Sequence, residues 1–445
     1  MPRQHLNPEQ VLKAARDNHV LFVNLQFTDI VGMVKSVTVP IGHLENALEN
    51  GVWFDGSSIE GFARVSESDM FLRPDPDTFA IIPWTDGGHK TARLICDVYT
   101  PDGERFLGSP RTALIVALEE AEEMGFEFFA GPELEFFLFQ MDANGDPLPG
   151  ATHDKASYFD ATADRGTVVR QDMVTALEAF GIDVETAHHE LAIGQHEIDF
   201  RYDYALAAAD NAVTFKYALK AVAAQHGAYA TFMPKPIRGI AGSGMHVHQS
   251  LNYVGSEGNA FADCDDAYGL SPLAKQFMAG QIQHAKAMTA ILAPLVNSYK
   301  RLVAGYEAPV YVSWARINRS ALIRVPRFPC PESTRIELRC PDPACNPYLA
   351  FAVMLKAGLD GIRNEMTLPE ATEENLFESE WARQGLETLP ASLREALDEM
   401  ERDPLIQDAL GPHIYERFID AKTQEWEDYR LSVSQWELDR YLARF

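Results

Sequence analysis

The sequence predicts an α+β protein made of a small N-terminal unit and a larger C-terminal unit. A chain of 445 residues with 46% hydrophobic content can bury two cores. Strand-like and helix-like segments follow one another without the strict alternation that a doubly wound parallel sheet requires. A hairpin pattern gives way to a capped helix near residue 104, and we therefore expect domains 1–104 and 105–445.

The N-terminal unit is predicted from short, well-delimited patterns. A helix over 8–18 has Pro8 near its start. Segments 20–29 and 32–40 alternate like two strands joined by a tight turn. A short helix is closed by Gly51, and 96–106 is expected to form a hairpin that ends the unit.

The C-terminal unit is predicted to mix strands and helices. Ser109 and Pro110 provide a cap and a first-turn proline for a helix that runs to Gly125. The last 55 or so residues have helical periodicity, and 255–269 is a loop rich in turn-forming residues. The expected strands are GPELEFFLF, HEIDFRY, AYATFMP, GMHVHQSLNYV, YVSWARIN and STRIELRC, and the expected central helices are 203–226, 272–296 and 345–364.

The charge balance is strongly acidic. The sequence has 38 Lys and Arg against 65 Asp and Glu, a formal net charge of −27, so neither nucleic acid nor an anionic membrane is expected as a partner. The N-terminus is a polar helix start and not a secretory signal, and no apolar run reaches the ~18 residues that a membrane span requires. The five cysteines match no zinc spacing, and we expect reduced thiols in a cytoplasmic protein.

Polar side chains recur at every second position of three strand-like segments. Residues i and i+2 point to the same face of a strand, so Glu133 and Glu135 share one face while Leu134 lies on the other. Burying a row of unpaired charges is very costly, so such rows indicate a site that a polyvalent cation or a polyanion fills. The residues on the polar faces are Glu133, Glu135, His246, His248, Ser250, Arg335, Glu337 and Arg339.

Five carboxylates and one histidine are candidate metal ligands. This set suits hard divalent ions such as Mg²⁺ or Mn²⁺ better than zinc, and two such ions would nearly balance five carboxylates. Any single glutamate is more often a salt-bridging surface residue, but most of these lie on the polar faces of otherwise apolar strands. The six candidates are Glu133, Glu135, Glu190, Glu197, His246 and Glu337.

Arginines are concentrated between positions 301 and 339, where no lysine occurs. Arginine binds carboxylate or phosphate through two parallel hydrogen bonds, which lysine cannot do. Two or three of them are expected to be structural partners of Asp or Glu, and the density of the rest favours a polyphosphate clamp. They are Arg301, Arg316, Arg319, Arg324, Arg327, Arg335 and Arg339.

Three further features are ambiguous when judged by pattern alone. The glycine-rich segment 239–244 can bring backbone close to a ligand, but it lacks the features of a P-loop and is equally typical of a plain turn. Asp55 lies in a turn, where aspartate is common for local reasons. Glu307 is an ordinary loop acid by composition.

Taken together, these segments resemble bacterial and archaeal type I glutamine synthetase, nearly from end to end. The matching motifs are WFDGSSIEGF, GPELEFF, AHHE…GQHEID, GSGMHVH, KRLVAGYEAP, NRSALIRVP and STRIELRCPDP. The resemblance implies a small N-terminal β-grasp domain and a large catalytic domain of the glutamine synthetase/guanido kinase-like type. It also implies a homo-oligomer, a dodecamer of two stacked hexameric rings with each active site between neighbouring subunits.

The resemblance further assigns roles to individual residues. One Mg²⁺ or Mn²⁺ ion would be held by Glu135, Glu190 and Glu197, and a second by Glu133, His246 and Glu337. ATP would contact Glu185, Tyr202, His248, Ser250 and Arg335, with Arg319 and Arg324 on the transferring phosphate. Glutamate would contact Gly242, His246, Arg301 and Arg339.

The implied reaction is the ATP-dependent ligation of ammonia to L-glutamate, which yields glutamine, ADP and phosphate. The γ-carboxylate would attack the terminal phosphate of ATP, and ammonia would then attack the resulting γ-glutamyl phosphate. Ammonium would bind near Asp55 of the neighbouring subunit and lose a proton there. Glu307 would help bind ammonium and would lie on a flap that keeps water from the intermediate.

The sequence departs from the family pattern at three positions. Ala241 stands where many members have an Asn that helps bind the amino-acid substrate, and Glu332 replaces a nucleotide-contacting Lys of some members. Phe377 replaces the Tyr that some members adenylylate, so we expect no control by that modification. The chain also resembles a shorter subtype in which an Arg, here Arg64, takes part in feedback inhibition by glutamine. A nitrogen-regulatory protein is compatible with the resemblance as a partner.

Two other functions compete with this interpretation. A ligase that joins glutamate to an organic amine, such as a polyamine or methylamine, is favoured by Ala241 but not by Asp55 and the YEAP segment, which fit ammonium. A catalytically silent structural or regulatory member would be expected to lack metal or phosphate ligands, whereas all six ligand positions and both phosphate arginines are present.

Overall fold

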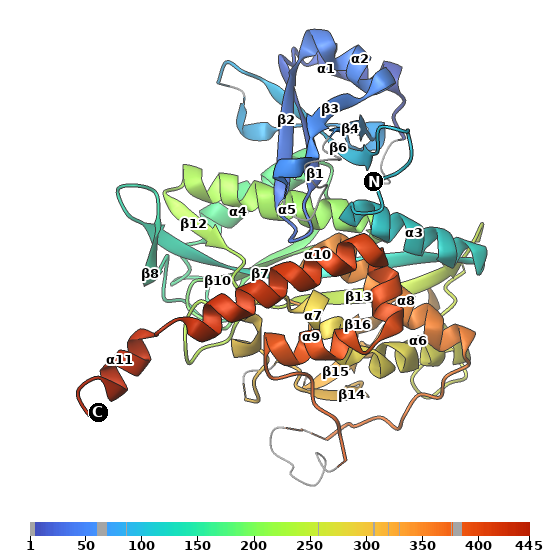
Figure 1. Cartoon of the computed structure of the whole chain (residues 1–445), viewed down its shortest axis with the longest axis vertical. Coiled ribbons are helices and arrows are strands. Elements are labelled where there is room, and N and C mark those ends of the chain that lie inside the picture. Colours follow the sequence, from blue (N-terminus) through green and yellow to red (C-terminus); the bar gives the residue numbers. More distant parts are fainter. Residues whose placement is uncertain are drawn as a thin grey trace.

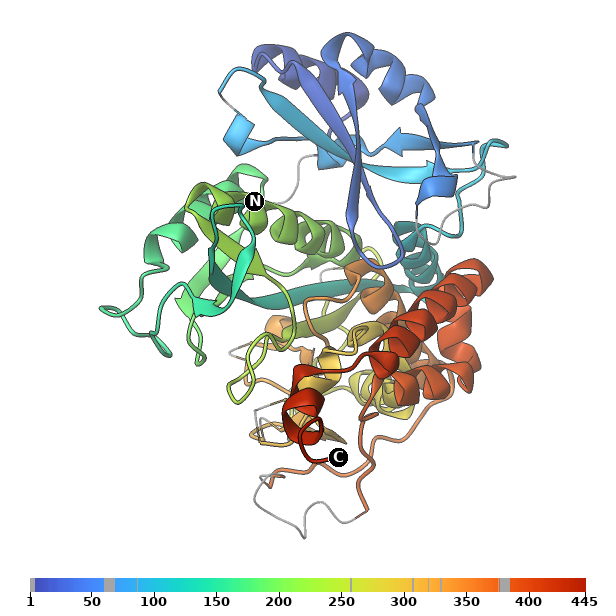
Figure 2. The same ribbon diagram turned by 60° about the vertical axis from the view of Figure 1, so that its left-hand side comes forward.

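The computed structural model confirms the α+β class. It describes residues 5–59, 69–85, 87–256, 258–305, 308–318, 320–328, 330–374, 376 and 385–445. An upper part is built on a six-stranded sheet and a lower part on a ten-stranded sheet (Figures 1 and 2). No helix within these described ranges is long and apolar enough to cross a membrane. All five cysteines are free.

The upper sheet has the strand order β2-β1-β6-β4-β3, with β5 beside β6. Strands β1 and β6 are parallel and the other neighbours are antiparallel. Two helices pack against the buried core of this sheet through Val11, Ala15 and Leu44. The elements are α1 (Pro8–Asp17), β1 (Phe22–Thr28), β2 (Val34–Pro40), α2 (Leu44–Asn50), β3 (Val52–Asp55), β4 (Asp69–Pro74), β5 (Ala80–Ile81) and β6 (Thr91–Tyr99).

Local signals explain the two helices of the upper part, and both predictions are confirmed. Asn7 and Gln10 form a reciprocal capping box at the start of α1, and Pro8 occupies its first turn. Gly51 ends α2 with φ +74°, and a Cβ there would lie 2.7 Å from the Leu72 carbonyl oxygen, so glycine is required.

The lower sheet has the order β14-β15-β16-β13-β7-β10-β9, and β8, β11 and β12 also pair with the long central strand β7. Strands β14 and β15 are parallel, and the other pairs are antiparallel. The strands are β7 (Phe126–Met141), β8 (Pro147–Thr152), β9 (Val184–His189), β10 (Gln195–Phe200), β11 (Asp203–Tyr204), β12 (Ala228–Thr231), β13 (Met245–Tyr253), β14 (Tyr311–Ala315), β15 (Ala321–Arg324) and β16 (Ile336–Leu338).

Helices cover the apolar face of this sheet. Leu134, Val247 and Leu338 are fully buried there in one large core, and helices α3 and α5 pack directly on β7. The charged side of β7, β10, β13 and β16 is left for the site described below. The helices are α3 (Pro110–Glu123), α4 (Thr167–Ala179), α5 (Ala205–Gln225), α6 (Pro272–Gln283), α7 (Ala285–Leu292), α8 (Pro347–Arg363), α9 (Leu393–Glu401), α10 (Pro404–Leu431) and α11 (Gln435–Tyr441).

A buried arginine joins the two parts. Arg111 in α3 lies 2.7 Å from Asp75 and 2.5 Å from Asp97 of the upper part, and its Nε donates to Asp210 of α5 at 3.1 Å. Tyr348 of α8 also donates to Asp210, at 2.7 Å. This network spans the junction between the sheets. The domain boundary expected near residue 104 stays a prediction.

Some predicted elements differ from the observed ones. The predicted helix 272–296 is broken at His284, where φ −97° and ψ 5° leave the helical region and the ring instead bonds Asp403 and Asp360. The second strand of the 96–106 hairpin is reduced to a single bridge between Tyr99 and Arg105. The STRIELRC strand is regular only over Ile336–Leu338. Strand β9, which contains both histidines of the HHE motif, was not predicted.

Candidate active site

Strand register brings the charged residues onto one face of the lower sheet. In the antiparallel pair of β10 and β7, Glu197 is opposite Glu135 and Asp199 is opposite Glu133. On the other side of β7, His246 of β13 is opposite Glu133. Residues directly opposite each other in a sheet point to the same face. The polar faces predicted separately for each strand therefore merge into one continuous surface.

The first predicted ligand set is compact. The ligand atoms of Glu133, His246 and Glu337 lie within 4.8 Å of one another. His246 Nδ1 is 3.6 Å from Glu133 Oε2 and 3.8 Å from Glu337 Oε1. Burial and the nearby Arg339 charge lower the pKa of His246 to about 4. The imidazole is therefore neutral at physiological pH, the form that binds a metal ion.

Cationic side chains surround Glu337. Burial by itself favours the neutral acid, but Arg339 and the neighbouring histidines and Arg324 hold the pKa of Glu337 below its ordinary value. Arg339 Nη1 donates to Glu337 Oε1 at 2.5 Å, and Arg324 donates to Glu337 Oε2. The Nε–H of Arg339 is buried and has no hydrogen-bond partner among the described residues. That donor is available to an anionic ligand.

The second predicted set is less compact. Glu135, Glu190 and Glu197 do not form a group as tight as the first. Glu197 instead belongs to a compact group with His188 and Asp199. His188 lies between two of the predicted ligands, with Nδ1 3.7 Å from Glu190 Oε1 and Nε2 3.4 Å from Glu197 Oε2. The imidazole ring thus occupies the gap between these carboxylates.

The acids of the second set repel one another. Burial, followed by the Glu190 charge, raises the pKa of Glu135 to about 8. Burial and the Glu135 charge raise the pKa of Glu197 well above its usual range. Carboxylates held together against their own repulsion fit a divalent cation, which removes the repulsion. Across both predicted sets the donors are carboxylate oxygens with one histidine nitrogen, a combination that suits Mg²⁺ or Mn²⁺.

A cavity of about 270 Å³ adjoins the first ligand set. Glu133 and His248 both line it, and Arg335 Nε donates to His248 Nδ1 at 3.3 Å. His248 Nε2 therefore carries the proton and donates to Glu133 Oε1 at 2.6 Å. Asp199 and Glu332 also line the cavity. So do all the residues predicted to contact the nucleotide apart from Arg319 and Arg324, namely Glu185, Tyr202, His248, Ser250 and Arg335.

The predicted glutamate residues meet at the glycine-rich segment before β13. A Cβ at Gly242 would lie 2.3 Å from the Pro234 carbonyl oxygen, and one at Gly244 would lie 2.6 Å from Arg301 Nη2. Gly242 therefore requires glycine, because the contact is with backbone, whereas a side chain at Gly244 would displace the Arg301 guanidinium. Arg301 is buried and donates to the carbonyl oxygens of Cys340 and Arg339, at 2.9 and 3.1 Å.

One predicted residue with a described position, Asp55, is not brought to this surface within one chain. Asp55 is exposed at the end of edge strand β3, where hydrogen bonds from Ser57 lower the pKa of its carboxyl. Figure 1 shows β3 in the upper part, away from β7, β13 and β16. Arg64, Glu307, Arg319 and Phe377 lie outside the described residues. A larger cavity of about 830 Å³ lies elsewhere, between the β1–β2 turn, α5 and α10.

Sequence reasoning missed several polar residues of the site. Asp199 follows Glu197 by two positions in the same strand, and this spacing was a signal that could have identified it. His188 is part of the AHHE motif but was given no role, and Gln195 carries no comparable signal. A further buried group, Asp154, His189 and His196, has ligand-like spacing. Because Arg170 donates to His196 Nδ1 at 2.9 Å, this group already contains a cation and is structural.

Comparisons with known proteins agree with this geometry. Residues 19–101 match the family model "Glutamine synthetase, beta-Grasp domain" and residues 107–441 match "Glutamine synthetase, catalytic domain". Curated glutamine synthetases of Methanosarcina mazei and Thermus thermophilus are each 52% identical; the alignments cover 98% of this chain and 97% and 99% of those proteins. A solved structure titled "GmaS/ADP complex-Conformation 1" has a TM-score of 0.88 at 32% identity, and the match covers 97% of this chain and 99% of that one. The chain belongs to the glutamine synthetase family.

Proposed function

We propose that this chain joins ammonia to L-glutamate with ATP, through γ-glutamyl phosphate, on the carboxylate-lined face of the lower sheet. The proposal is based on one observation: the compact group of candidate metal ligands lies directly beside a cavity. Glu133 belongs to the compact ligand group and also lines the cavity with the predicted nucleotide residues. A nucleotide in that cavity would have its phosphates beside the ligand group.

The proposed residue roles follow from charge. Two Mg²⁺ or Mn²⁺ ions, one on Glu133, His246 and Glu337 and one on Glu135, Glu190 and Glu197, would neutralise phosphate charge. Arg319 and Arg324 bind the transferring phosphate, and Arg301, Arg339 and Gly242 bind glutamate. The buried Nε–H of Arg339, which has no partner in the described part of the chain, supports a carboxylate ligand there.

The reaction then proceeds in two displacements. The γ-carboxylate oxygen of glutamate attacks the terminal phosphorus of ATP, and ADP leaves. Asp55 takes a proton from ammonium, the ammonia nitrogen attacks the acyl carbon, and phosphate leaves with the C–O bonding pair and accepts the surplus proton of the new amide nitrogen. The low-dielectric surroundings of Glu337 and Arg339 strengthen the contacts to charged groups during both steps.

The deciding test compares amines. Purified protein with ATP, Mg²⁺ and glutamate is given ammonium, methylamine or putrescine, and phosphate release and product identity are followed together. We expect strong preference for ammonium, with glutamine as the product. An organic-amine product would support the competing ligase instead. The organic amines are included because of Ala241. This residue, which precedes Gly242 in the proposed glutamate loop, packs against the apolar side chains of Phe137, Phe139 and Ala192.

The flap residue gives a more specific prediction. Glu307→Ala is expected to leave nucleotide binding intact while glutamine formation falls by at least about 100-fold, because general acid–base and positioning groups typically contribute that much. Calorimetric titration with ADP and a glutamine assay measure the two effects. Near wild-type glutamine formation by this variant would contradict the assigned role.

We also propose that the chain belongs to the type I, non-adenylylated subtype that glutamine inhibits. Phe377 offers no hydroxyl for adenylylation, and an adenylyl group detected on segment 374–377 by mass spectrometry would refute this. Arg64→Ala is expected to raise the glutamine concentration for half-inhibition at least several-fold, measured against ammonium-dependent turnover. Equal inhibition of both proteins would remove Arg64 from the regulatory site.

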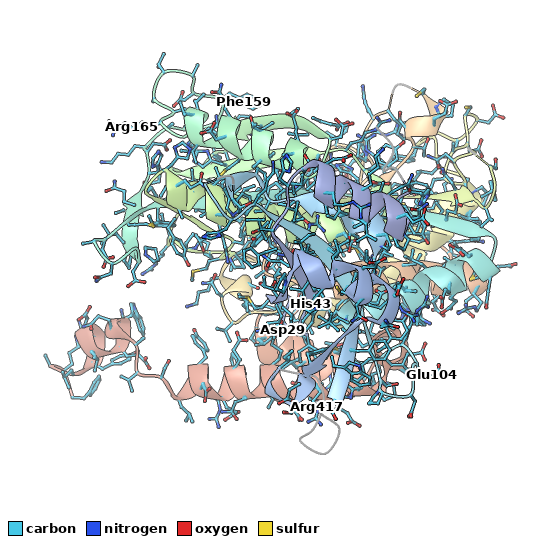
Figure 3. All side chains as sticks on the ribbon, turned by 90° about the horizontal axis from the view of Figure 1, so that it is seen from above. Asp29, His43, Glu104, Phe159, Arg165 and Arg417 are labelled. Atoms are coloured by element: carbon cyan, nitrogen blue, oxygen red, sulfur yellow. The ribbon has the colours of Figure 1, made fainter. Side chains whose placement is uncertain are left out.

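For its assembly we propose a cytoplasmic homo-oligomer, a dodecamer of two hexameric rings, with domains 1–104 and 105–445. The projecting C-terminal segment supports self-association (Figures 1 and 3). Its large apolar side chains are exposed in the single chain, and such surfaces usually mark an interface. They are Leu431, Val433, Trp436, Leu438, Tyr441, Leu442 and Phe445.

A further inference from the structure

One buried amide touches both the proposed ion site and the proposed glutamate loop. Gln195, the first residue of β10, is 1% exposed. Its Nε2 donates to Glu135 Oε2 at 2.7 Å and to the Gly242 carbonyl oxygen at 3.2 Å. Its Oε1 accepts from the Ala192 backbone N–H at 3.3 Å. Both amide hydrogens and the amide oxygen are therefore engaged, and the side chain has one orientation.

Glu135 is tied to the same loop a second time. Its Oε2 also accepts the Gly244 backbone N–H at 2.9 Å, and its own backbone N–H donates to the Gly244 carbonyl oxygen at 3.1 Å. Two N–H donors thus hold Oε2, which leaves Oε1 as the less encumbered oxygen for a cation. Because the carboxylate rotates as a unit, moving Oε1 toward an ion also moves the Gln195 amide.

The glycine-rich loop 239–244 is also held by residues 234–235, which contact it away from Gln195. The Ser243 backbone N–H donates to the Pro234 carbonyl oxygen at 2.8 Å, and Lys235 Nζ contacts the Ile240 carbonyl oxygen. A Cβ at Gly242 would clash with Pro234, so this segment fits tightly against 234–235. With that side fixed, the Gln195 amide is the side-chain connection between Glu135 and the Gly242 carbonyl group.

We propose that Gln195 is a positioning residue that makes binding of the divalent cation at Glu135 and binding of glutamate at the Gly242 loop mutually dependent. This rests on the proposed function, which puts a cation and glutamate at these two places. A coupling free energy acts equally in both directions, so each ligand strengthens the other by the same factor. Gln195 contacts no reacting atom and acts through Glu135 and Gly242.

The test measures binding rather than turnover. Glutamate affinity of the full-length assembled protein is measured by calorimetry with and without Mn²⁺, and Mn²⁺ affinity is measured by electron paramagnetic resonance with and without glutamate. In the wild type we expect Mn²⁺ to tighten glutamate binding at least about fivefold, the lower end of usual coupling. In Gln195→Met, which keeps the length but loses the amide, we expect less than about a twofold effect in both directions.

A matched control is available in the core. Gln281 is fully buried and donates from its amide to Gln249 and to the Met354 carbonyl oxygen, and it contacts neither Glu135 nor the Gly242 loop. Gln281→Met loses a buried amide of the same kind and should keep the wild-type coupling. Gln195→Asn, which is one methylene too short to span both partners, should lose the coupling and serves if Gln195→Met does not fold.

The outcomes separate the inference from the proposed function. Full wild-type coupling in Gln195→Met or Gln195→Asn overturns the role of Gln195, and so does an equal loss in Gln281→Met. If the wild-type protein binds glutamate and Mn²⁺ independently, the coupling is refuted while the proposed function stands. If it binds neither, the proposed function itself falls.

Discussion

At the scale of single residues, the two proposed cation sites differ in how their negative charge is balanced. Around Glu337 the charge is met by Arg339 and Arg324. Glu135 and Glu197 form no ion pair with arginine in the described part of the chain; the charges of Arg301 and Arg339 act on Glu135, but burial and the neighbouring acids outweigh them, and the pKa of both acids is raised. One half of the site is therefore held by built-in cations, whereas the other half depends on a cation supplied from solution.

Arg339 offers a way to separate ion pairing from substrate binding. Arg339→Lys keeps a positive charge beside Glu337 but loses the buried Nε–H, because an ammonium group cannot reproduce the guanidinium fork. We expect the KM for glutamate to rise at least about tenfold, which corresponds to ~1.4 kcal/mol. The KM for ATP should change less than about twofold, since the charge at Glu337 is kept.

Steady-state kinetics with each substrate varied in turn measures this separation. Arg363→Lys serves as the control, because Arg363 forms a half-exposed ion pair with Glu120 away from the site. A parallel loss of ATP affinity in Arg339→Lys would show that the residue acts mainly through the ion site.

At the scale of secondary-structure elements, the sequence predicted what depends on local periodicity. The alternation in GPELEFF and GMHVHQS identified the polar faces of β7 and β13 because side-chain direction repeats every two residues within one strand. Strand register depends on pairing between distant segments, so the approach of Gln195 to Glu135 could not be read from either segment alone. Asp199 was overlooked although its spacing from Glu197 obeys the same rule.

The break between α6 and α7 has a tertiary cause that periodicity cannot reveal. His284 Nδ1 is 2.6 Å from Asp403, the N-cap of α10, and its Nε2 is 3.2 Å from Asp360 of α8. Burial opposes charge on this imidazole, but the two aspartates outweigh burial and raise the pKa of His284. Burial likewise opposes ionisation of Asp403, yet His284 and backbone donors hold the pKa of that carboxyl below its usual range. The ring thus connects α6–α7 to two other helices.

The helix junction should make stability depend on pH. A raised histidine pKa stabilises the folded state below the unfolded value of about 6.5, and the gain is lost as pH rises through the folded pKa. A lowered aspartate pKa stabilises the folded state above the unfolded value of about 4, and this contribution is lost as the pH falls through the folded pKa. The free energy of unfolding of the wild type should therefore exceed that of His284→Gln by about 1–2 kcal/mol near pH 5.5 and by less near pH 8.5.

Calorimetric melting of both proteins at the two pH values measures that difference. Lys286 is a suitable control because it lies two residues from His284 in the first turn of α7, yet it pairs with the exposed Glu387 and not with Asp403 or Asp360. Lys286→Gln should show no comparable pH dependence. A constant difference between wild type and His284→Gln at both pH values would mean that the imidazole is not charged in the folded protein.

At the scale of the whole molecule, the position of Asp55 is the main constraint. The Arg111 network fixes the upper part on the lower part through Asp75, Asp97 and Asp210. In that arrangement Asp55 is exposed at the end of edge strand β3, which lies in the upper part, separate from the strands of the carboxylate face of its own chain (Figure 1). A function for Asp55 in catalysis thus requires a neighbouring subunit. The sequence could suggest this only through resemblance, since no local pattern encodes which chain completes a site.

Mixing two inactive variants tests the shared site. Asp55→Ala removes a residue of the upper part, and Arg339→Ala removes one of the lower part. If neighbouring subunits complete one another, co-expressed variants should recover activity, up to about one quarter of wild type for random assembly into rings. Each variant alone is the control. No recovery in mixed oligomers, verified by differential tagging and mass, would place Asp55 and Arg339 in the same chain's site or exclude Asp55 from catalysis.

The register of β10 against β7 also bears on how this chain can change in length. Glu197 and Asp199 both reach the charged face because each lies directly across from an acid of β7. Adding one residue inside β10 would turn that strand's acids toward the hydrophobic core and bring Ile198 to the polar side. The β7–β8 turn at 142–146 is exposed, and no side chain of the carboxylate face comes from it. Natural variation in length is therefore expected to accumulate at that turn and to be excluded from β10, so the spacing between Glu190 and Glu197 should be fixed even where the surrounding sequence is not.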